Sequence, residues 1–385
     1  MCLKPYKSWY NKQNYFKAQT MKLNLIFVGN IFIYNPSFKE YILREVEKQG
    51  LFADSVTHFK ESDNSLFLDM EREINGDIKT SMLMVITTKQ IFSTLGKVIC
   101  TITGDNLVLQ DSLLLPQKSS IFAQDTYLLE YKNTMLNVMQ VEIGEKLPDI
   151  LLKDERSSGI FHIFEEQQES ISMMLSPIAQ TYNVHFIVTR QIEGWHRVDF
   201  SSNKYGDIAK FIEASKKLLP KKLIATTNVV EYIIEKLSSI GKKISFAESC
   251  TGGLLSYYFT KNNGASKILD GSLVTYSNAL KENWLAVSHQ TLEQNGAVSS
   301  EVVDEMSDGV LNVSNADYAI SISGIAGDSG GTKEKPVGTV YVGVRSKEKH
   351  MHQRLYLNGD RNYIQQQSVL YGIKLLVLID KETFF

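Results

Sequence analysis

Short apolar runs alternate with helical patterns of hydrophobic residues along most of the chain. Between residues 22 and 145, the runs LNLIFVG and SMLMVITT predict buried strands. The segment FKEYILREVEKQG predicts a helix that ends at Gly50. Strands and helices that alternate in this way are typical of a largely parallel sheet covered by helices. We therefore expect an α/β domain over residues 22–145.

A shorter, mixed pattern follows over residues 146–222. A helix (EEQQESISMMLSPIAQTY), two strands (VHFIVTR and WHRVDFSS) and a closing helix (DIAKFIEASKKLLP) are predicted in that order. This order indicates a small α+β module, and Pro220 among lysines marks its exit.

Residues 225–385 return to the α/β pattern. NVVEYIIEKLSSIGKK predicts an amphipathic helix, and KKISFA, GSLVTYS, DYAISISGIAG and GTVYVGVRS predict strands. IQQQSVLYGIKLLVLI predicts a second amphipathic helix that closes the domain. The fold class is therefore α/β, with a small α+β module between two α/β domains.

Composition excludes some classes of function. The formal net charge of −2 gives no general attraction for nucleic acid or for an anionic membrane surface. No apolar stretch approaches the ~20 residues of a membrane-spanning helix. Cys2, Cys100 and Cys250 are few and far apart, which favours reduced thiols in a cytoplasmic protein. Residues 1–21 lack the apolar core of a signal peptide and are expected to be a disordered leader, with Met21 as an alternative start.

The segment AESCTGG places Ser249 where a predicted strand passes into a helix. Backbone N–H groups at a helix start have no internal partner, and the helix dipole favours negative charge there. Ser249 could attack a carbonyl group while N–H groups from Cys250 to Gly253 receive the developing oxyanion. The alternative is a glycine turn that only lets the helix pack closely, with Ser249 as its N-cap.

A serine hydroxyl needs a base to become a nucleophile. His289, His350 and His352 lie in polar or charged stretches, so we expect all three at the surface. A lysine can act instead if burial or a neighbouring cation lowers its pKa. VTYSNALK offers Tyr276 and Lys281, although Lys281 taken alone fits a solvated helix position equally well.

Two glycine-rich turns, SGIAGDSGG and KPVGT, follow predicted strands, and their glycines permit a close approach of backbone to a ligand. In the segment GDR, Arg361 could hold a phosphate through two parallel hydrogen bonds. A surface ion pair of Asp360 with a lysine is the alternative reading of that segment.

Taken in order, these motifs resemble the CinA family of competence/damage-inducible proteins, whose C-terminal domain has the nicotinamide mononucleotide deamidase fold. The matching stretches span nearly all of residues 240–370: AESCTGG, GASKILDGSLVTYSNALK, GAVSSEVVDEM, ADYAISISGIAGDSGG, KPVGTVYVGV and GDR. The resemblance implies a serine–lysine dyad that needs no metal or cofactor. Ser249 would attack the carboxamide of nicotinamide mononucleotide and Lys281 would accept its proton. Tyr276 would orient the dyad or the substrate, and Arg361 would stabilise the negative charge of the phosphate.

The resemblance also implies substrate contacts and a homodimer. The implied substrate-binding residues lie in the turn after Ser249, in the loop after the strand DYAISIS and in GDR: Cys250, Thr251, Gly252, Gly253, Gly324, Ala326, Gly327 and Arg361. Two positions depart from the family pattern, with Ser323 in place of threonine and Asp328 in place of proline. Asp328 would weaken affinity if its loop contacts the phosphate.

Upstream, the order of elements resembles full-length CinA, with a molybdopterin-binding-like domain over 22–145 and a KH-like module over 146–222. The site motifs of that first domain are lost, since Val28-Gly29-Asn30-Ile31 replaces a VGTE-like turn and TTKQIFST replaces a TTGGLGPT-like loop. A loop without those glycines cannot bring its N–H groups against a pyrophosphate in the same way. We expect this domain to be catalytically silent and to serve as a scaffold or dimerisation surface. The middle module lacks a GxxG segment, so we expect no binding of nucleic acid there.

Two rival hypotheses remain at this stage. One is thiol chemistry at Cys250, whose pKa a helix start would lower. The other is a non-catalytic adaptor in DNA uptake or stress response that keeps the pocket as a sensor of a pyridine nucleotide.

Overall fold

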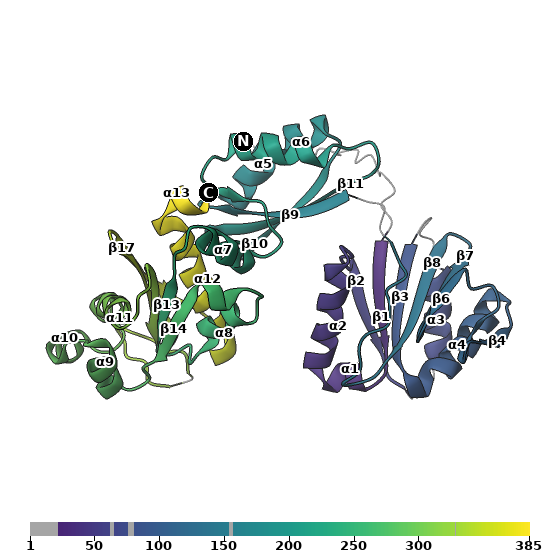
Figure 1. The fold of residues 1–385 in the computed structure, drawn as a ribbon, viewed down its shortest axis with the longest axis horizontal. Helices are drawn as coiled ribbons and strands as arrows, with labels where there is room; N and C mark the ends of the chain where they lie inside the picture. Colours follow the sequence, from purple (N-terminus) through teal and green to yellow (C-terminus); the bar gives the residue numbers. More distant parts are fainter. Residues whose placement is uncertain (1–21, 62–64, 76–80, 154–156, 328) are drawn as a thin grey trace, which may run out of the picture. The chain divides into compact units, whose positions relative to one another are not determined.

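The structure is a computed structural model that describes residues 22–61, 65–75, 81–153, 157–327 and 329–385. The expected leader over 1–21 and the departure at Asp328 lie outside the described residues. The described residues form two compact units, one that ends at residue 153 and one that begins at residue 157, each with its own mixed α/β architecture (Figure 1).

The first unit is built on a six-stranded sheet in the order β2-β1-β3-β8-β7-β6. Four neighbouring strands are parallel: β2 (Ser55–Phe59), β1 (Lys22–Val28), β3 (Ser81–Thr88) and β8 (Thr134–Val141). The last two are antiparallel: β7 (Thr126–Tyr131) and β6 (Ile121–Ala123). β3 is buried over nearly its whole length, which explains its uninterrupted apolar run.

Helices cover both faces of this sheet (Figure 1). One face carries α1 (Ile31–Tyr34) and α2 (Pro36–Lys48), and the other carries α3 (Leu66–Asn75) and α4 (Lys89–Thr103). A separate ribbon pairs β4 (Leu107–Gln110) with β5 (Leu113–Pro116).

The two segments that depart from the family pattern are filled by secondary structure. TTKQIFST is not a loop, because α4 begins at Lys89 directly after β3. After Gly29 the chain enters α1, where the fully buried Phe32 packs its ring on Phe27 and Phe38.

The second unit begins with a four-stranded antiparallel sheet in the order β10-β11-β9-β12, which we call the middle module (157–224). Its strands are β9 (Ser157–Phe164), β10 (His185–Ile192), β11 (Trp195–Ser202) and β12 (Leu223–Ile224). Helices α5 (Gln168–Thr181) and α6 (Ile208–Leu218) pack on one face of the sheet. The predicted order of helix, strand, strand and helix is confirmed by α5, β10, β11 and α6, whereas β9 before them and β12 after them were not predicted.

The remainder of the unit surrounds a five-stranded sheet in the order β14-β13-β15-β16-β17. Three strands are parallel: β14 (Leu269–Val274), β13 (Ile244–Glu248) and β15 (Tyr318–Gly324). β16 (Thr339–Ser346) and β17 (His350–Tyr356) are antiparallel. One face carries α7 (Val229–Ser239), α8 (Leu254–Thr260), the short 3₁₀ helix η1 (Ala265–Lys267), α12 (Arg361–Ile379) and α13 (Lys381–Phe384). The other carries α9 (Asn278–Leu285), α10 (His289–Asn295) and α11 (Ser300–Val313).

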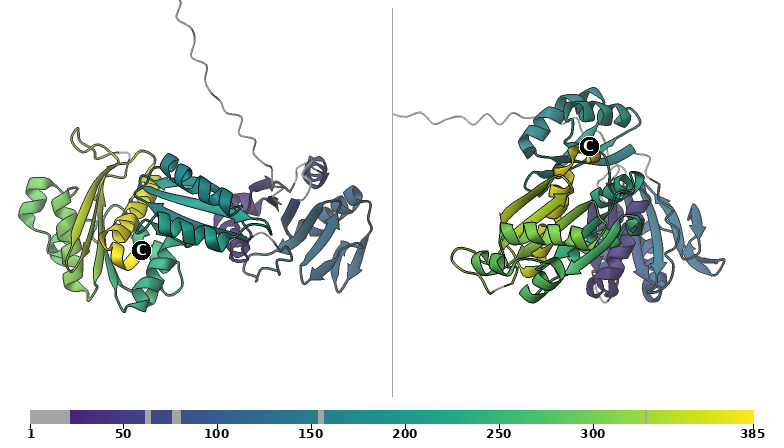
Figure 2. Two further views of the ribbon diagram at one scale, coloured as in Figure 1. Left: turned by 90° about the horizontal axis from the view of Figure 1, so that it is seen from above. Right: turned by 60° about the vertical axis from the view of Figure 1, so that its left-hand side comes forward.

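The prediction that the last long helix is amphipathic is wrong. α12 is buried on most of its sides, because it packs against the five-stranded sheet and its C-terminal half also meets the middle module (Figure 2). Lys374 Nζ on α12 donates to the Glu193 carbonyl oxygen at 2.7 Å, and Trp195 belongs to the same apolar cluster as α12. No helix in the described part of the chain is both long and apolar enough to cross a bilayer.

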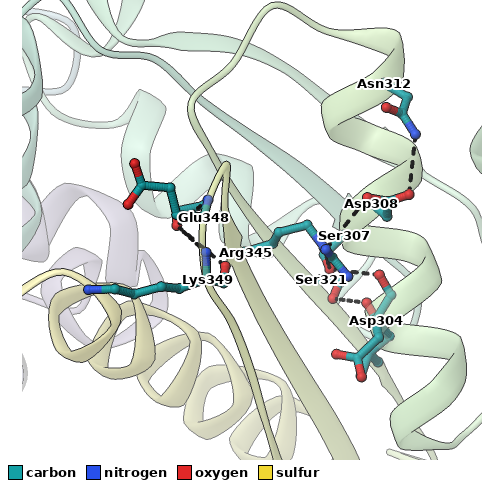
Figure 3. Close-up of polar contacts among 10 residues, drawn as sticks. Asp304, Ser307, Asp308, Asn312, Ser321, Arg345, Glu348 and Lys349 are labelled. Carbon is teal, nitrogen blue, oxygen red and sulfur yellow. Dashed lines mark hydrogen bonds and ion pairs between the residues drawn. The ribbon is translucent and has the colours of Figure 1, made fainter.

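Polar contacts fix α11 against the sheet (Figure 3). Arg345 on β16 reaches Ser307 Oγ at 3.4 Å and Asp308 at 3.6 Å, and Ser321 Oγ donates to the Val303 carbonyl oxygen at 2.6 Å. α11 in turn packs closely against the end of α9 at Gly309. A Cβ atom added to this glycine would lie 2.0 Å from a backbone oxygen of α9. This chain of contacts sets the position of α9, which carries Lys281.

Candidate active site

A serine and a lysine meet at the carboxyl end of the parallel strands. Ser249 follows β13, and Lys281 lies on α9, which follows the neighbouring strand β14. Because parallel neighbours end at the same edge of the sheet, the two side chains come together. Lys281 Nζ donates to Ser249 Oγ at 3.0 Å and to the Thr275 carbonyl oxygen at 2.7 Å. Ser249 is 8% exposed and Lys281 is 1% exposed.

Burial changes the acid–base behaviour of this lysine. Its pKa falls from 10.5 to about 8, because removing the ammonium from water penalises the charged form. A neutral amine has a lone pair that can accept the serine proton, which an ordinary lysine rarely offers at neutral pH. The pair therefore has the geometry and the protonation behaviour of a nucleophile and its base.

The turn after Ser249 is shaped by a buried carboxylate. Glu248, the last residue of β13, is fully buried, and its side chain accepts hydrogen bonds from the backbone N–H groups of Gly253, Leu255 and Ser256 at 2.9–3.0 Å. The two glycines of the motif have φ of 58° and 100°, a left-handed backbone that suits glycine and curls the chain around the carboxylate. Glu248 belongs to the AESCTGG motif but was not predicted as a site residue, although an acid at the end of a buried strand needs such donors.

This arrangement narrows the expected set of oxyanion donors. The Gly253 N–H is bound to Glu248, and the Gly252 N–H donates to the Ser249 carbonyl oxygen at 3.1 Å. The N–H groups of Cys250 and Thr251 make no hydrogen bond to another described residue. These two N–H groups directly follow Ser249 in the chain, so they are the remaining candidates among the predicted oxyanion donors.

Tyr276 and Arg361 form an exposed pair near the dyad. Arg361 Nη2 donates to Tyr276 Oη at 2.6 Å. Gly327 lies against the same guanidinium, since a Cβ atom at Gly327 would be 2.9 Å from Arg361 Nη1. One helical turn after Arg361, Gln365 Nε2 donates to the Cys250 carbonyl oxygen at 2.6 Å. Gln365 was missed in the sequence, although its i+4 spacing from Arg361 places both on one face of α12.

The remaining predicted residues lie around this centre in different environments. Thr251 is 3% exposed, and its hydroxyl has no hydrogen-bond partner among the described residues. Ala326 is buried. Gly324 packs against the neighbouring strand, since a Cβ atom there would lie 2.7 Å from Val340 Cγ2. Ser323 turns inward and donates to the Ala297 carbonyl oxygen at 2.7 Å.

The expected lowering of the pKa of Cys250 is wrong. Burial raises the pKa of its thiol to about 12. α8 begins only at Leu254, so Cys250 precedes the helix start, and the thiol is enclosed by apolar side chains. This thiol stays protonated at neutral pH, which argues against the thiol-chemistry hypothesis.

The prediction that His289 lies at the surface is confirmed. His289 is exposed and bridges Glu282 and Glu293, and its pKa is raised by the hydrogen bond to Glu282. Among the described residues, no three His, Cys, Asp or Glu side chains form a group that could hold a metal ion.

Residues 226–379 match the family model described as the CinA C-terminal domain. A CinA-like protein of Thermosipho melanesiensis is 40% identical over 179 residues, which is 46% of this chain and 44% of that protein. A CinA-like protein of Endomicrobium trichonymphae is 34% identical over 234 residues, 57% of this chain and 55% of that protein. Among solved structures, the crystal structure of a competence/damage inducible protein of Agrobacterium tumefaciens is 35% identical in sequence. The match covers 39% of this chain and 92% of that chain, with a TM-score of 0.38. The matched segments thus span about half the length of these two CinA-like relatives.

Proposed function

The chain belongs to the CinA family, and from that premise we propose that residues 225–385 hydrolyse the carboxamide of nicotinamide mononucleotide to nicotinate mononucleotide and ammonia. The observation that carries the proposal is the 3.0 Å contact between Ser249 Oγ and the buried Lys281 Nζ. A pocket that only senses a nucleotide needs no serine held against a lysine of lowered pKa.

The first half of the reaction forms an acyl-enzyme. Neutral Lys281 takes the hydroxyl proton as Ser249 Oγ attacks the carboxamide carbon, and the N–H groups of Cys250 and Thr251 stabilise the oxyanion. One such donor commonly changes kcat by about 10²–10³-fold. When the tetrahedral intermediate collapses, the C–N bond breaks and the Lys281 ammonium gives its proton to the departing nitrogen, which leaves as ammonia.

The second half regenerates the serine. Lys281, neutral again, takes a proton from water as the water oxygen attacks the nicotinoyl ester. Collapse of the second intermediate breaks the bond between the acyl carbon and Ser249 Oγ, and Lys281 returns the proton to that oxygen. The product carries a carboxylate in place of the carboxamide.

Binding of the nucleotide is assigned to the exposed pair near the dyad. The Arg361 guanidinium is a planar donor that suits a phosphate group, and Tyr276 holds it by accepting one of its hydrogen bonds. Because this pair does not touch the dyad, we expect it to affect affinity more than the chemical step.

The test is ammonia release from nicotinamide mononucleotide by the purified full chain. We expect turnover by the wild type, its loss in Ser249→Ala, and near wild-type turnover in Cys250→Ser, whose thiol has no role in the mechanism. Calorimetric binding of nicotinamide mononucleotide without any ammonia release would refute the hydrolase proposal in favour of the sensor hypothesis. Loss of turnover in Cys250→Ser with Ser249→Ala still active would restore thiol chemistry.

The expectations for the rest of the chain stay proposals. We propose that residues 22–145 are catalytically silent, that the middle module binds no nucleic acid, and that the protein is a cytoplasmic homodimer.

A further inference from the structure

A carboxylate with no contact to the solvent lies immediately before the nucleophile. Each Glu248 oxygen accepts two hydrogen bonds: Oε2 from Gly253 N and Leu255 N at 3.0 Å, and Oε1 from Ser256 N at 2.9 Å and Ser272 Oγ at 3.1 Å. A buried charge is tolerated only where such donors replace water. The mechanism proposed above makes no use of this group.

The same residue is tied to the dyad through its backbone. The Thr275 N–H donates to the Glu248 carbonyl oxygen at 2.8 Å, and the Thr275 carbonyl oxygen receives the Lys281 amine. Glu248 therefore joins three parts of the site: the strand that ends at Ser249, the turn that follows it, and the segment that holds Lys281.

We propose that Glu248 is a positioning residue for Ser249, a proposal that rests on the function proposed above. Its carboxylate draws the N–H groups of 253, 255 and 256 to one point, so the turn between them and Ser249 has a single shape. Within that shape the N–H groups of Cys250 and Thr251, which follow Ser249 directly in the chain, make no hydrogen bond to another described residue. Gln365 holds the opposite side of the turn through the Cys250 carbonyl oxygen.

The proposal predicts that the acceptor character of both oxygens matters, not only the size of the side chain. Glu248→Gln has nearly the same volume but presents one oxygen and one NH₂ group, and the NH₂ group would face donors that already point inward. The turn must then open on one side to relieve this donor–donor contact. The donors beside Ser249 would move, and catalytic donors act only at close range.

The experiment compares Glu248→Gln with Glu235→Gln, a matched change at an exposed position on α7 of the same unit. Two readouts are measured on the full chain: steady-state turnover of nicotinamide mononucleotide, and the rate at which a serine-reactive phosphonofluoridate labels Ser249. Circular dichroism and the melting temperature report folding. We expect kcat per labelled site and the labelling rate to fall about 100-fold in Glu248→Gln, the effect of losing one oxyanion donor. We expect KM to change less than about 3-fold, because Arg361 and Tyr276 are untouched, and Glu235→Gln to match the wild type.

A merely structural role would lower the melting temperature of Glu248→Gln and leave kcat per labelled site unchanged, and that result would overturn the proposal. If Glu248→Gln does not fold, Ser272→Ala, which removes one donor to Oε1, decides the question. A decrease of kcat and labelling rate by a common factor then supports the proposal, and wild-type values of both overturn it. If the wild type releases no ammonia from nicotinamide mononucleotide, the proposed function fails, whereas the labelling rates still test the positioning of Ser249.

Discussion

Replacing Lys281 with methionine separates the stability of this site from its activity. Methionine has a similar length but no charge, so Lys281→Met removes the base and we expect no ammonia release. It also removes a lysine whose folded-state pKa is about 8 instead of 10.5. A difference of that size corresponds to about 3 kcal/mol by which the buried ammonium opposes folding below pH 8.

The sign of the effect on stability therefore depends on pH. Below pH 8 the lysine is charged in both states and burial of its charge costs the full amount, whereas between pH 8 and 10.5 only the unfolded state binds the proton. Wild-type stability gains from this group as pH rises through that window. Loss of the amine also leaves the buried Thr275 carbonyl oxygen without its donor, at a cost of about 1–2 kcal/mol. Lys281→Met should thus be more stable than the wild type by about 1–2 kcal/mol at pH 7, and less stable by a similar amount at pH 11.

Urea unfolding followed by tryptophan fluorescence measures this, since Trp195 and Trp284 both lie in the second unit. Lys267→Met, at an exposed position on η1, is the control for the loss of an ordinary lysine. The informative quantity is the difference in free energy of unfolding between variant and wild type at each pH. A difference that is constant from pH 7 to pH 11 would refute the reasoning, because Lys281 would then have an unperturbed pKa.

The folded-state pKa of Lys281 also predicts how the activity of the wild type depends on pH. At pH 7 a lysine of pKa 8 is neutral in about 10% of molecules, against about 0.03% for a pKa of 10.5. Burial therefore raises the population of the base form roughly 300-fold at pH 7. We expect kcat/KM to rise about tenfold per pH unit below pH 7 and to level off above about pH 8.

Three further predictions concern other parts of the molecule. Arg361→Ala should raise KM for nicotinamide mononucleotide at least tenfold, and Tyr276→Phe, which keeps the ring, should raise KM less. Equal KM values in both variants and the wild type would contradict the assigned phosphate contact. Gly309→Ala should lower the free energy of unfolding by about 2–3 kcal/mol or more, because the added methyl group would lie 2.0 Å from the Leu285 carbonyl oxygen. A melting temperature equal to that of the wild type would contradict the tight packing of α11 on α9. The full chain incubated with ADP-ribose and a divalent metal should release no phosphorylated product, because α4 begins directly after β3 and the glycine loop of the family pattern is missing. Robust turnover would show that residues 22–145 are not silent.

Most elements of the second unit could be predicted from local patterns. The strand before Ser249 and the glycine turn after it each have a local signature, namely an apolar run and a Gly-Gly pair. The burial of α12 could not be predicted correctly in this way. The periodicity of hydrophobic residues describes a helix with one buried face, and α12 has two buried faces. Its second face is covered by a module that lies more than a hundred residues earlier in the chain.

The residues of the candidate site likewise fall into those that the sequence indicated and those whose properties depend on the fold. The resemblance to CinA proteins pointed to Ser249 and Lys281, but the lowered pKa of the lysine depends on burial by segments that are distant in sequence. Cys250 shows the opposite case, since proximity to a predicted helix start suggested a thiol of lowered pKa, whereas burial in the folded chain raises that pKa. Glu248 and Gln365 gained a role only when the donors and acceptors around the turn were known.

The sequence by itself determined which residues carry reactive groups and many of the segments that form strands or helices, because both follow from side-chain chemistry and from hydrophobic spacing over a few residues. Only the tertiary structure decided which groups are buried and which hydrogen bonds they make. Those two properties set the protonation of Lys281 and the free donors beside Ser249, since both depend on the removal of water by parts of the chain that meet only after folding.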